Sequence, residues 1–156
     1  MVARDIMKTE VVSLLGTDTA RRAGEVMLES GYSALPVIDE SGILLGVFGE
    51  SDILALTLPE YLSTVDLSFL PKSISFPMPG GQDLDSVQVA SVLRPQMLRA
   101  VPPDEPVVEV ARIMVREHVR RCFVVEDRKL VGIISRRDLM QIIVRPTIEA
   151  NGSEEA

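Results

Sequence analysis

The residues best suited to chemistry lie in one short segment near the end of the chain, Gly132-Ile133-Ile134-Ser135-Arg136-Arg137-Asp138. An apolar run ends at Ser135 and a helical pattern begins there, which predicts a junction between a strand and a helix. Ser135 would be the N-cap, and Asp138 follows at the spacing of a capping box, in which hydroxyl and carboxylate satisfy free backbone N–H groups. The hydroxyl and N–H groups at such a helix start could also bind phosphate, and the carboxylate could accept both hydroxyls of a ribose. The residues by themselves leave the structural and the ligand-binding interpretations open.

Arginines lie close to this junction and favour an anionic ligand. Arg120 and Arg121 come just before the neighbouring predicted strand, within reach of phosphate oxygens. Residues 1–90 carry 5 basic and 13 acidic side chains, whereas residues 91–146 carry 11 basic and 7 acidic ones. The second part of the chain is therefore the better place for an anion, although arginines that merely solvate helix faces would give the same count.

A second pair of reactive residue types, His118 and Cys122, does not amount to a catalytic centre. The two residues are four apart, a separation that would suit a nucleophile and its base. No third residue that would orient the histidine is apparent, and Cys122 opens an apolar strand. A zinc site needs three or four clustered ligands, and the sequence shows no such cluster. We therefore predict that the protein is not an enzyme and binds no metal.

The composition is that of an ordinary globular protein. The 156 residues, 46% hydrophobic and 25% charged, fit one compact domain or two small ones. A net charge of −7 argues against nucleic-acid binding, which stays a minor alternative through the basic second half. No apolar run approaches the roughly 20 residues that span a bilayer, and the N-terminus lacks the apolar stretch of a secretory signal. The single cysteine cannot form an internal disulfide. These features predict a cytoplasmic protein without a membrane segment.

The chain contains an internal duplication with an offset of about 87 residues. Segment 46–54 corresponds to segment 132–140, and segment 25–29 corresponds to segment 112–116. Order and spacing agree over about fifty residues, which is long enough to decide the architecture. The duplication indicates two related binding sites rather than one catalytic centre.

Each repeat reads as strand, helix, strand, strand, helix. An acidic residue before proline favours a helix start because its carboxylate can cap free N–H groups, and Asp104-Glu105-Pro106 has this pattern. The other predictions for the second repeat are strands at 97–101, 122–126 and 130–134 and a closing helix at 135–144. Those for the first repeat are helices at 17–30 and 50–58 and strands at 35–39 and 43–48.

The stretch between the repeats, residues 58–87, departs from the repeat pattern. It is rich in proline and glycine, yet it contains two of the four phenylalanines, which makes it more apolar than a free linker. We expect it to fold back onto the body as a lid or as part of a dimer contact, and a partly ordered surface loop is the open alternative. Residues 146–156 are expected to form a disordered tail.

The paired pattern resembles a tandem of CBS domains, a regulatory unit also called a Bateman module. Leu35-Pro36-Val37-Ile38-Asp39 matches the family's x-Pro-Val-hydrophobic-Asp strand, and Gly132 to Asp138 matches its Gly-hydrophobic-hydrophobic-Ser/Thr-x-x-Asp junction. The resemblance covers residues 3–57 as CBS repeat 1 and 88–145 as CBS repeat 2. It implies an α+β fold in which two repeats, each β-α-β-β-α, pack with pseudo-twofold symmetry and leave two clefts between them.

By the same resemblance, the clefts would bind an adenosine compound: AMP, ADP, ATP or S-adenosylmethionine. Asp138 and Asp52 would hold ribose hydroxyls, and Ser135 would touch phosphate or ribose. Arg121 stands at the position where some family members have an arginine that contacts phosphate, and Arg120 is beside it. The residues expected to border the adenine or to face a cleft are Leu35, Pro36, Cys122, Phe123 and Thr9, together with segment 95–97.

Two departures from the family pattern bear on these sites. Gly49 takes the place of Ser/Thr in repeat 1, and Phe123 takes the place of the strand proline in repeat 2. We therefore expect one competent site, formed mainly by repeat 2, and one weak or empty site. The predicted function is a stand-alone regulatory module that requires no cofactor, forms a homodimer and signals its ligand state to an unknown partner protein. The alternative is an interaction scaffold whose ligand sites have degenerated.

Overall fold

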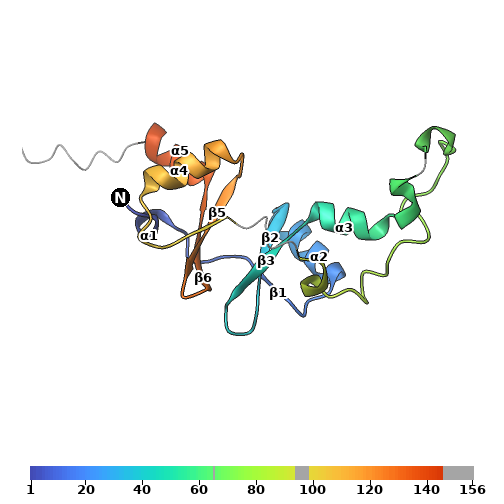
Figure 1. Ribbon diagram of the computed structural model, residues 1–156, viewed down its shortest axis with the longest axis horizontal. Coiled ribbons are helices and arrows are strands. Elements are labelled where there is room, and N and C mark those ends of the chain that lie inside the picture. The colour runs from blue at the N-terminus through green and yellow to red at the C-terminus, as the bar shows by residue number, and fades with distance from the viewer. Residues whose placement is uncertain (65, 94–98, 146–156) are drawn as a thin grey trace, which may run out of the picture. The chain divides into compact units, whose positions relative to one another are not determined.

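The computed structural model describes residues 1–64, 66–93 and 99–145 (Figure 1). The chain divides into two compact units, one formed by Val12–Leu98 and the other by Met1–Val11 together with the chain from Arg99 onward. Segment 94–98 and the predicted disordered tail, 146–156, lie outside the described residues. The compact units thus divide the chain differently from the sequence repeats, because the first residues of the chain fold with the second repeat.

The described residues of the unit Val12–Leu98 form one three-stranded sheet, two α-helices and short 3-10 helices. Its elements are β1 (Leu14–Leu15), α2 (Ala20–Ser30), β2 (Ala34–Ile38), β3 (Leu44–Gly49) and α3 (Glu50–Thr57). β1 is parallel to β2, and β2 is antiparallel to β3. The Thr19 hydroxyl caps α2 by accepting a hydrogen bond from the Arg22 N–H at 3.1 Å, at the helix start that the sequence predicts.

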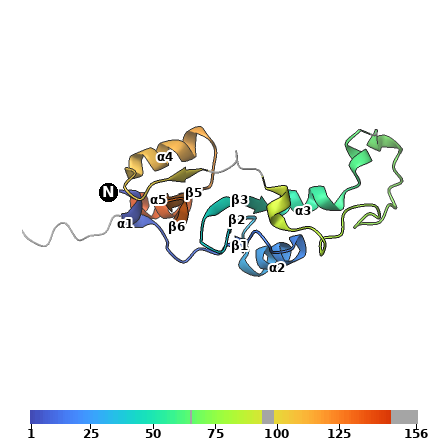
Figure 2. The ribbon, with the colours of Figure 1, turned by 60° about the horizontal axis from the view of Figure 1, so that its bottom comes forward.

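The core of this unit lies between α2 and the sheet. Ala20, Ala23 and Met27 recur at helical spacing and form the buried face of α2. They pack with Leu35 and Phe48, whose side chains are almost completely buried. A short 3-10 helix, η3 (Val89–Val92, yellow-green in Figure 2), lies against β3 and completes this core.

The segment between the repeats begins beyond α3 and returns to the same unit. Two 3-10 helices, η1 (Glu60–Ser63) and η2 (Leu67–Phe69), form within it. At its end, the Ala20 N–H donates to the Val87 carbonyl at 2.8 Å, and Val87 joins the core. The end of the segment thus joins the unit, whereas its expected folding back as a lid or as part of a dimer contact stays a prediction, and so does the alternative of a surface loop.

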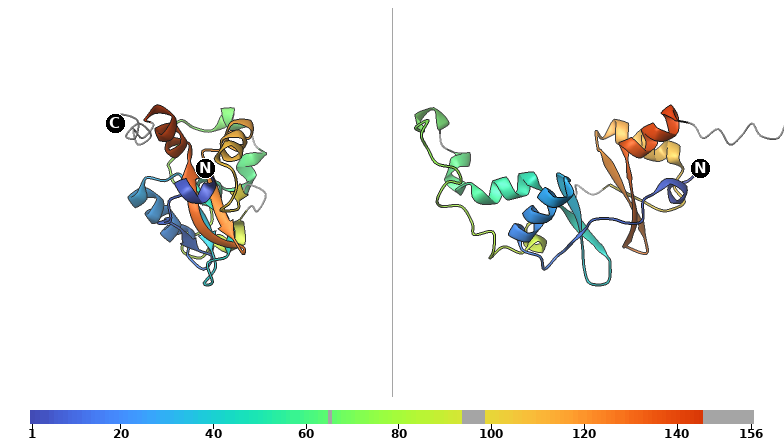
Figure 3. Two further views of the ribbon diagram at one scale, coloured as in Figure 1. Left: turned by 90° about the vertical axis from the view of Figure 1, so that its left-hand side faces the viewer. Right: turned by 180° about the vertical axis from the view of Figure 1, so that it is seen from behind.

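The second unit repeats the same architecture. Its elements are α1 (Ala3–Ile6), β4 (Ala100–Val101), α4 (Val107–Arg116), β5 (Arg121–Glu126), β6 (Lys129–Ser135) and α5 (Arg136–Val144). β4 is parallel to β5 and β5 is antiparallel to β6, which is the arrangement of the first sheet. Helices α4 and α5 pack side by side next to this sheet (Figure 3). The order of elements predicted from the duplication is thus confirmed in both repeats.

The N-terminal segment completes the second unit. Lys8 and Ile133 exchange two backbone hydrogen bonds of 2.9 Å each, so this segment runs antiparallel beside β6. Met7 is thereby placed over Gly132, where a Cβ atom would come within 2.5 Å of the methionine sulfur. Close packing therefore favours glycine at position 132, at the start of the predicted junction, because a methyl group there would force the Met7 side chain to move.

The start of α4 differs from the prediction. The helix begins at Val107 with Pro106 as the N-cap, and no side chain caps it, although the sequence predicts a cap from the carboxylate of Asp104 or Glu105. The Val107 N–H donates instead to the carbonyl of Met1 at 3.1 Å. A backbone acceptor from the N-terminal segment thus does the work of the carboxylate, and no local sequence pattern reveals such a contact.

Candidate functional site

The junction between β6 and α5 has the geometry that the sequence predicts. Ser135 is the N-cap of α5, and its hydroxyl accepts a hydrogen bond from the Asp138 N–H at 3.2 Å. In return, the Ser135 N–H and the Ser135 hydroxyl both donate to Asp138 Oδ2, each at 2.7 Å. This reciprocal capping box fixes the position of the carboxylate at the first turn of the helix.

The Asp138 carboxylate is nearly enclosed by protein. Its side chain is 9% exposed, and its other oxygen, Oδ1, lies 3.1 Å from the ammonium nitrogen of Lys8. Burial alone raises the pKa of this carboxyl group, but the hydrogen bonds from Ser135 and the ammonium of Lys8 outweigh burial and hold the pKa below its ordinary value. Asp138 is therefore ionised at neutral pH, and its two oxygens have different partners.

A hollow of about 820 Å³ opens beside this carboxylate, within the second unit. Its volume lies within the range of about 300–1,000 Å³ that is typical of small-molecule pockets. Asp138 and Gln141 contribute polar groups, and Lys8 and Arg145 contribute positive charge. The apolar part of the lining consists of Met1, Ile6 and Ile142. The hollow can therefore offer a ligand one carboxylate, two cations and an apolar wall.

Sequence reasoning missed the three other polar or charged residues that line this hollow, Lys8, Gln141 and Arg145. Gln141 and Arg145 follow Asp138 by three and seven residues, so the helical repeat of α5 could have identified them. Lys8 reaches the site because the N-terminal segment pairs with β6, a contact between residues far apart in the sequence. Thr9, which was predicted instead, is exposed and adjacent to Lys8.

The two predicted arginines lie at the same end of the sheet as Ser135. Arg121 is directly opposite Ser135 in the pairing of β5 with β6, so the two side chains project from the same face. Arg120 is exposed, and its carbonyl accepts a hydrogen bond from the Arg136 N–H at 3.0 Å. The backbone thus brings Arg121 and Ser135 together, as the ligand-binding interpretation expects.

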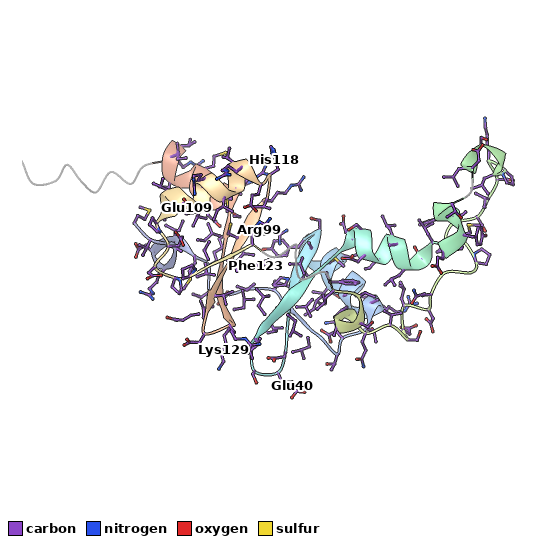
Figure 4. All side chains as sticks on the ribbon, viewed as in Figure 1. Glu40, Arg99, Glu109, His118, Phe123 and Lys129 are labelled. Atoms are coloured by element: carbon purple, nitrogen blue, oxygen red, sulfur yellow. The ribbon has the colours of Figure 1, made fainter. Side chains whose placement is uncertain are left out.

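Cys122 and Phe123, which were predicted to border the adenine, are both buried. Cys122 is fully enclosed in the core, and burial raises the pKa of its thiol, although the charge of Arg99 acts in the opposite direction. His118, just beyond the end of α4 (Figure 4), is exposed, so the two residues do not present a shared reactive surface. A buried thiol with a raised pKa is a poor nucleophile. Phe123 is 7% exposed, so little of its ring is accessible to a base.

The corresponding junction in the first repeat is simpler. The Gly49 N–H donates to Asp52 Oδ2 at 2.8 Å, but there is no hydroxyl to complete the box. A Cβ atom on Gly49 would lie 3.0 Å from the Ser33 carbonyl oxygen, so close packing explains the glycine. Leu35 and Pro36 are buried in β2. Residues of the turn 39–41 help to line a hollow of about 390 Å³ in this unit. Asp52 is not among the lining residues.

Comparison with protein families settles what the duplication represents. The CBS domain model matches residues 3–58 and again residues 89–145. The chain belongs to the CBS domain family. It is a tandem CBS pair of the α+β class, with two repeated three-stranded mixed sheets and accompanying helices, and the resemblance inferred from the motifs is confirmed. The second match ends at the end of the Ser135–Asp138 helix, so the junction described above lies within the second CBS domain.

Relatives of known sequence include CBS proteins of similar length and parts of larger proteins. An uncharacterized protein of Methanocaldococcus jannaschii is 28% identical, and the match covers 92% of this chain and 92% of the relative. Homoserine O-acetyltransferase of Methanococcoides burtonii is 26% identical, but the match covers 89% of this chain and only 23% of the acetyltransferase. Similarity to the enzyme is thus confined to a part of it, and enzymatic activity does not follow for this chain.

Similar solved structures include complexes with adenosine compounds. CBSX2 in complex with AMP has a TM-score of 0.68 and 23% identity and covers 92% of this chain and 96% of that one. The CBS domain of a bacterial CNNM/CorC family Mg²⁺ transporter in complex with ATP has a TM-score of 0.65 and 23% identity. The match covers 92% of this chain and 87% of that one. The CBS domain pair of a protein in complex with 5-methylthioadenosine and S-adenosyl-L-methionine has a TM-score of 0.62 and 19% identity. The match covers 92% of this chain and 96% of that one. At these identities, the likeness establishes the fold.

In residues 1–64, 66–93 and 99–145, no three His, Cys, Asp or Glu side chains gather in a way that could hold a metal ion. Within the same ranges, no helix has both the length and the apolar character that crossing a membrane requires.

Proposed function

We propose that this protein is a regulatory module that binds an adenine nucleotide, chiefly at the Ser135–Asp138 junction of its second CBS repeat. The observation that carries the proposal is the Asp138 carboxylate, which is buried, ionised and adjacent to a hollow of about 820 Å³. The AMP complex of CBSX2 and the ATP complex of the transporter CBS domain support this class of ligand.

The two oxygens of Asp138 would have different tasks. Oδ2 stays with the Ser135 N–H and hydroxyl, which hold the carboxylate in place. Oδ1 would accept a hydrogen bond from a ribose hydroxyl in place of its contact with Lys8. The Lys8 side chain is 66% exposed, so its ion pair is weak and can be exchanged at little cost.

Positive side chains around the junction would bind the phosphate. Lys8 and Arg145 line the hollow, and Arg121 lies opposite Ser135 on the adjacent strand. Lys8 would leave Asp138 and turn toward phosphate when the ribose takes its place. This cationic surrounding favours AMP, ADP or ATP over S-adenosylmethionine, which has a sulfonium and no phosphate.

The site of the first repeat would be the weaker of the two. Asp52 has the position of Asp138, but Gly49 supplies no hydroxyl, and Ser33 and Ala34 stand where the second repeat has Arg120 and Arg121. A nucleotide at this repeat would therefore lack both a hydrogen bond and a cation.

Nucleotide binding would act on a partner protein through a change in conformation or pairing. A ligand can shift such an equilibrium only by its difference in affinity for two states, and a coupling of about 1–3 kcal/mol gives a five- to 150-fold effect. In this proposal the module works as a homodimer in the cytoplasm, without catalysis of its own and without a further cofactor. Pull-down experiments with and without nucleotide would identify the regulated protein.

Isothermal titration calorimetry with AMP, ADP, ATP and S-adenosylmethionine tests the proposal. Asp138→Asn should weaken nucleotide binding about tenfold or more, because a charged acceptor is lost, whereas the matched variant Asp52→Asn should change it less than about threefold. Both variants keep the size of the side chain, and their melting temperatures provide the control for folding. Equal effects of the two substitutions would contradict a principal site in the second repeat.

One observation favours the alternative of an interaction scaffold without ligand. Lys8 already satisfies Asp138 Oδ1 at 3.1 Å, so the carboxylate has a protein partner on both oxygens. If none of the four compounds binds, and Asp138→Asn lowers only the melting temperature, the junction is a capping device and the scaffold interpretation is correct.

A further inference from the structure

The segment between the repeats has a structure of its own that the shared CBS fold does not account for. The CBS domain model matches residues 3–58 and 89–145, so residues 59–88 lie outside both matches. Within them, η1 and η2 extend beyond the end of α3, away from the sheet of their unit (green in Figure 1 and Figure 2). A binding surface on this segment is therefore distinct from the ligand site described above.

A hollow of about 570 Å³ lies between the end of α3 and this segment. Its lining is apolar except for Glu60 and Ser75. Every lining residue falls between Ala55 and Met78, within the unit Val12–Leu98, so the hollow belongs to one unit alone. The apolar side chains that line it include Leu58, Leu62, Leu67, Leu70, Ile74 and Phe76.

The segment is attached to its unit where it returns from the hollow. The Gln82 N–H donates to the Leu56 carbonyl at 2.8 Å, and Arg21 Nε donates to Asp85 at 2.7 Å. Gly81 passes so close to the Thr57 carbonyl that a Cβ atom at this position would collide with it. The hollow is thus closed by backbone contacts that join the segment to the end of α3.

The exposure of the side chains around the hollow indicates a protein partner rather than a small molecule. Phe76 is 72%, Leu67 is 56% and Tyr61 is 55% exposed. A small-molecule pocket buries most of its ligand, which requires walls that are more enclosed than these. Exposed aromatic and aliphatic side chains around an apolar hollow are typical of a surface that another protein covers.

The charges around the hollow favour a basic partner. Segment 58–87 has four acidic side chains and one basic side chain, Lys72. Glu60 lines the hollow, Asp66 is the N-cap of η2, and both are exposed. Hydrogen bonds from Ser68 lower the pKa of Asp66, so its carboxylate is ionised at neutral pH. Opposite charge on a partner would speed association and select the partner.

The elements around the hollow favour a helix as the structure of the bound segment. Each lining residue belongs to α3, to a 3-10 helix or to an irregular stretch of the chain. Addition of a strand requires the edge of a sheet, whereas an amphipathic helix binds by placing its apolar face into a groove. The lining therefore suits the apolar face of a helix.

We propose that the hollow at residues 55–78 binds an amphipathic helix of a partner protein, with apolar side chains in the hollow and Lys or Arg side chains beside Glu60 and Asp66. This surface would be the place where the proposed regulatory module meets the protein that it regulates. Docking at this surface needs no nucleotide, so it can be tested separately from the site at Asp138.

Fluorescence anisotropy with a labelled model helix tests the proposal. The probe is a peptide of about 18 residues, in which leucine and lysine alternate at helical spacing so that one face is apolar. Wild-type protein should bind it saturably. Phe76→Ser should weaken binding about tenfold because an aromatic anchor is lost, and Glu60→Gln combined with Asp66→Asn should weaken it about threefold or more.

Exposed positions on α2 of the same unit provide matched controls. Leu28→Ser removes an exposed apolar side chain, and Glu25→Gln combined with Glu29→Gln removes two exposed charges. Neither change should alter peptide binding. Equal losses at α2 and at the hollow would show that the peptide binds through general charge and would overturn the proposal, as would a wild type that does not bind the peptide saturably.

Two further measurements distinguish other occupants of the hollow. If Phe76→Ser changes the sedimentation of the protein alone, a second copy covers the surface. If the apolar dye 1-anilinonaphthalene-8-sulfonate binds at the hollow and the peptide does not displace it, the hollow takes a small molecule. Either result would overturn the proposal. Phe76→Ser should leave the affinity for AMP unchanged, so a failure of nucleotide binding and a failure of peptide docking are distinguishable.

Discussion

Replacing Asp138 by alanine should lower the free energy of unfolding by about 2–3 kcal/mol at neutral pH. The carboxylate accepts two hydrogen bonds of 2.7 Å from Ser135, and loss of a helix cap costs about 0.5–2 kcal/mol. The donors at Ser135 would also be left without their charged partner in a half-buried place, which adds about 1 kcal/mol. The ion pair with Lys8 adds little, because the lysine is 66% exposed.

Urea denaturation followed by circular dichroism measures this loss, and Asp52→Ala is the matched control. Asp52 accepts only the Gly49 N–H at 2.8 Å, without a hydroxyl or a nearby lysine pair among the contacts described, so its loss should cost about 1 kcal/mol. If the two variants are equally destabilised, or if Asp138→Ala costs less than about 1 kcal/mol, the capping box at Ser135 does not have the strength that its geometry implies.

Three further predictions follow from the same contacts. Because folding lowers the pKa of Asp138, its contribution to stability is complete above the unfolded pKa of about 3.9 and disappears as pH falls through the lower folded pKa. The difference in free energy of unfolding between wild type and Asp138→Asn should therefore shrink from about pH 7 to about pH 2.5. A difference that stays constant over this range would contradict the prediction. Lys8→Ala should weaken ATP binding about threefold or more while sparing adenosine, as measured by calorimetry, and equal losses for both would show that Lys8 does not bind phosphate. Gly132→Ala should destabilise by about 1–3 kcal/mol because its methyl group would collide with Met7, and the additional substitution Met7→Ala should recover part of this loss in urea denaturation.

The fold could be predicted from the sequence because its signals are local and occur twice. The polar run before Ala20 marks the start of α2, and the apolar run to Ile134 followed by Ser135 and Asp138 marks the junction of β6 with α5. A capping box depends on residues three apart, so its geometry is written in the spacing. The duplication then fixed the order of elements in both repeats.

Features that depend on the N-terminal segment could not be predicted in this way. The contact of Lys8 with Asp138, the close packing of Met7 on Gly132 and the hydrogen bond from Val107 to Met1 all join the first residues to the second repeat. Periodicity carries no information about such pairings. The sequence therefore predicts the carboxylate at the centre of the candidate site but not the lysine that pairs with it.

The central claim is that Asp138 receives the ribose of an adenine nucleotide, and one calorimetric comparison tests it most directly. AMP and 2′,3′-dideoxy-AMP differ only in the two ribose hydroxyls, one of which would donate a hydrogen bond to Oδ1. Wild-type protein should bind AMP about tenfold more tightly than the dideoxy compound, and Asp138→Asn should lose most of this preference. An Asp138→Asn variant that keeps the full preference for AMP would show that the ribose is held elsewhere.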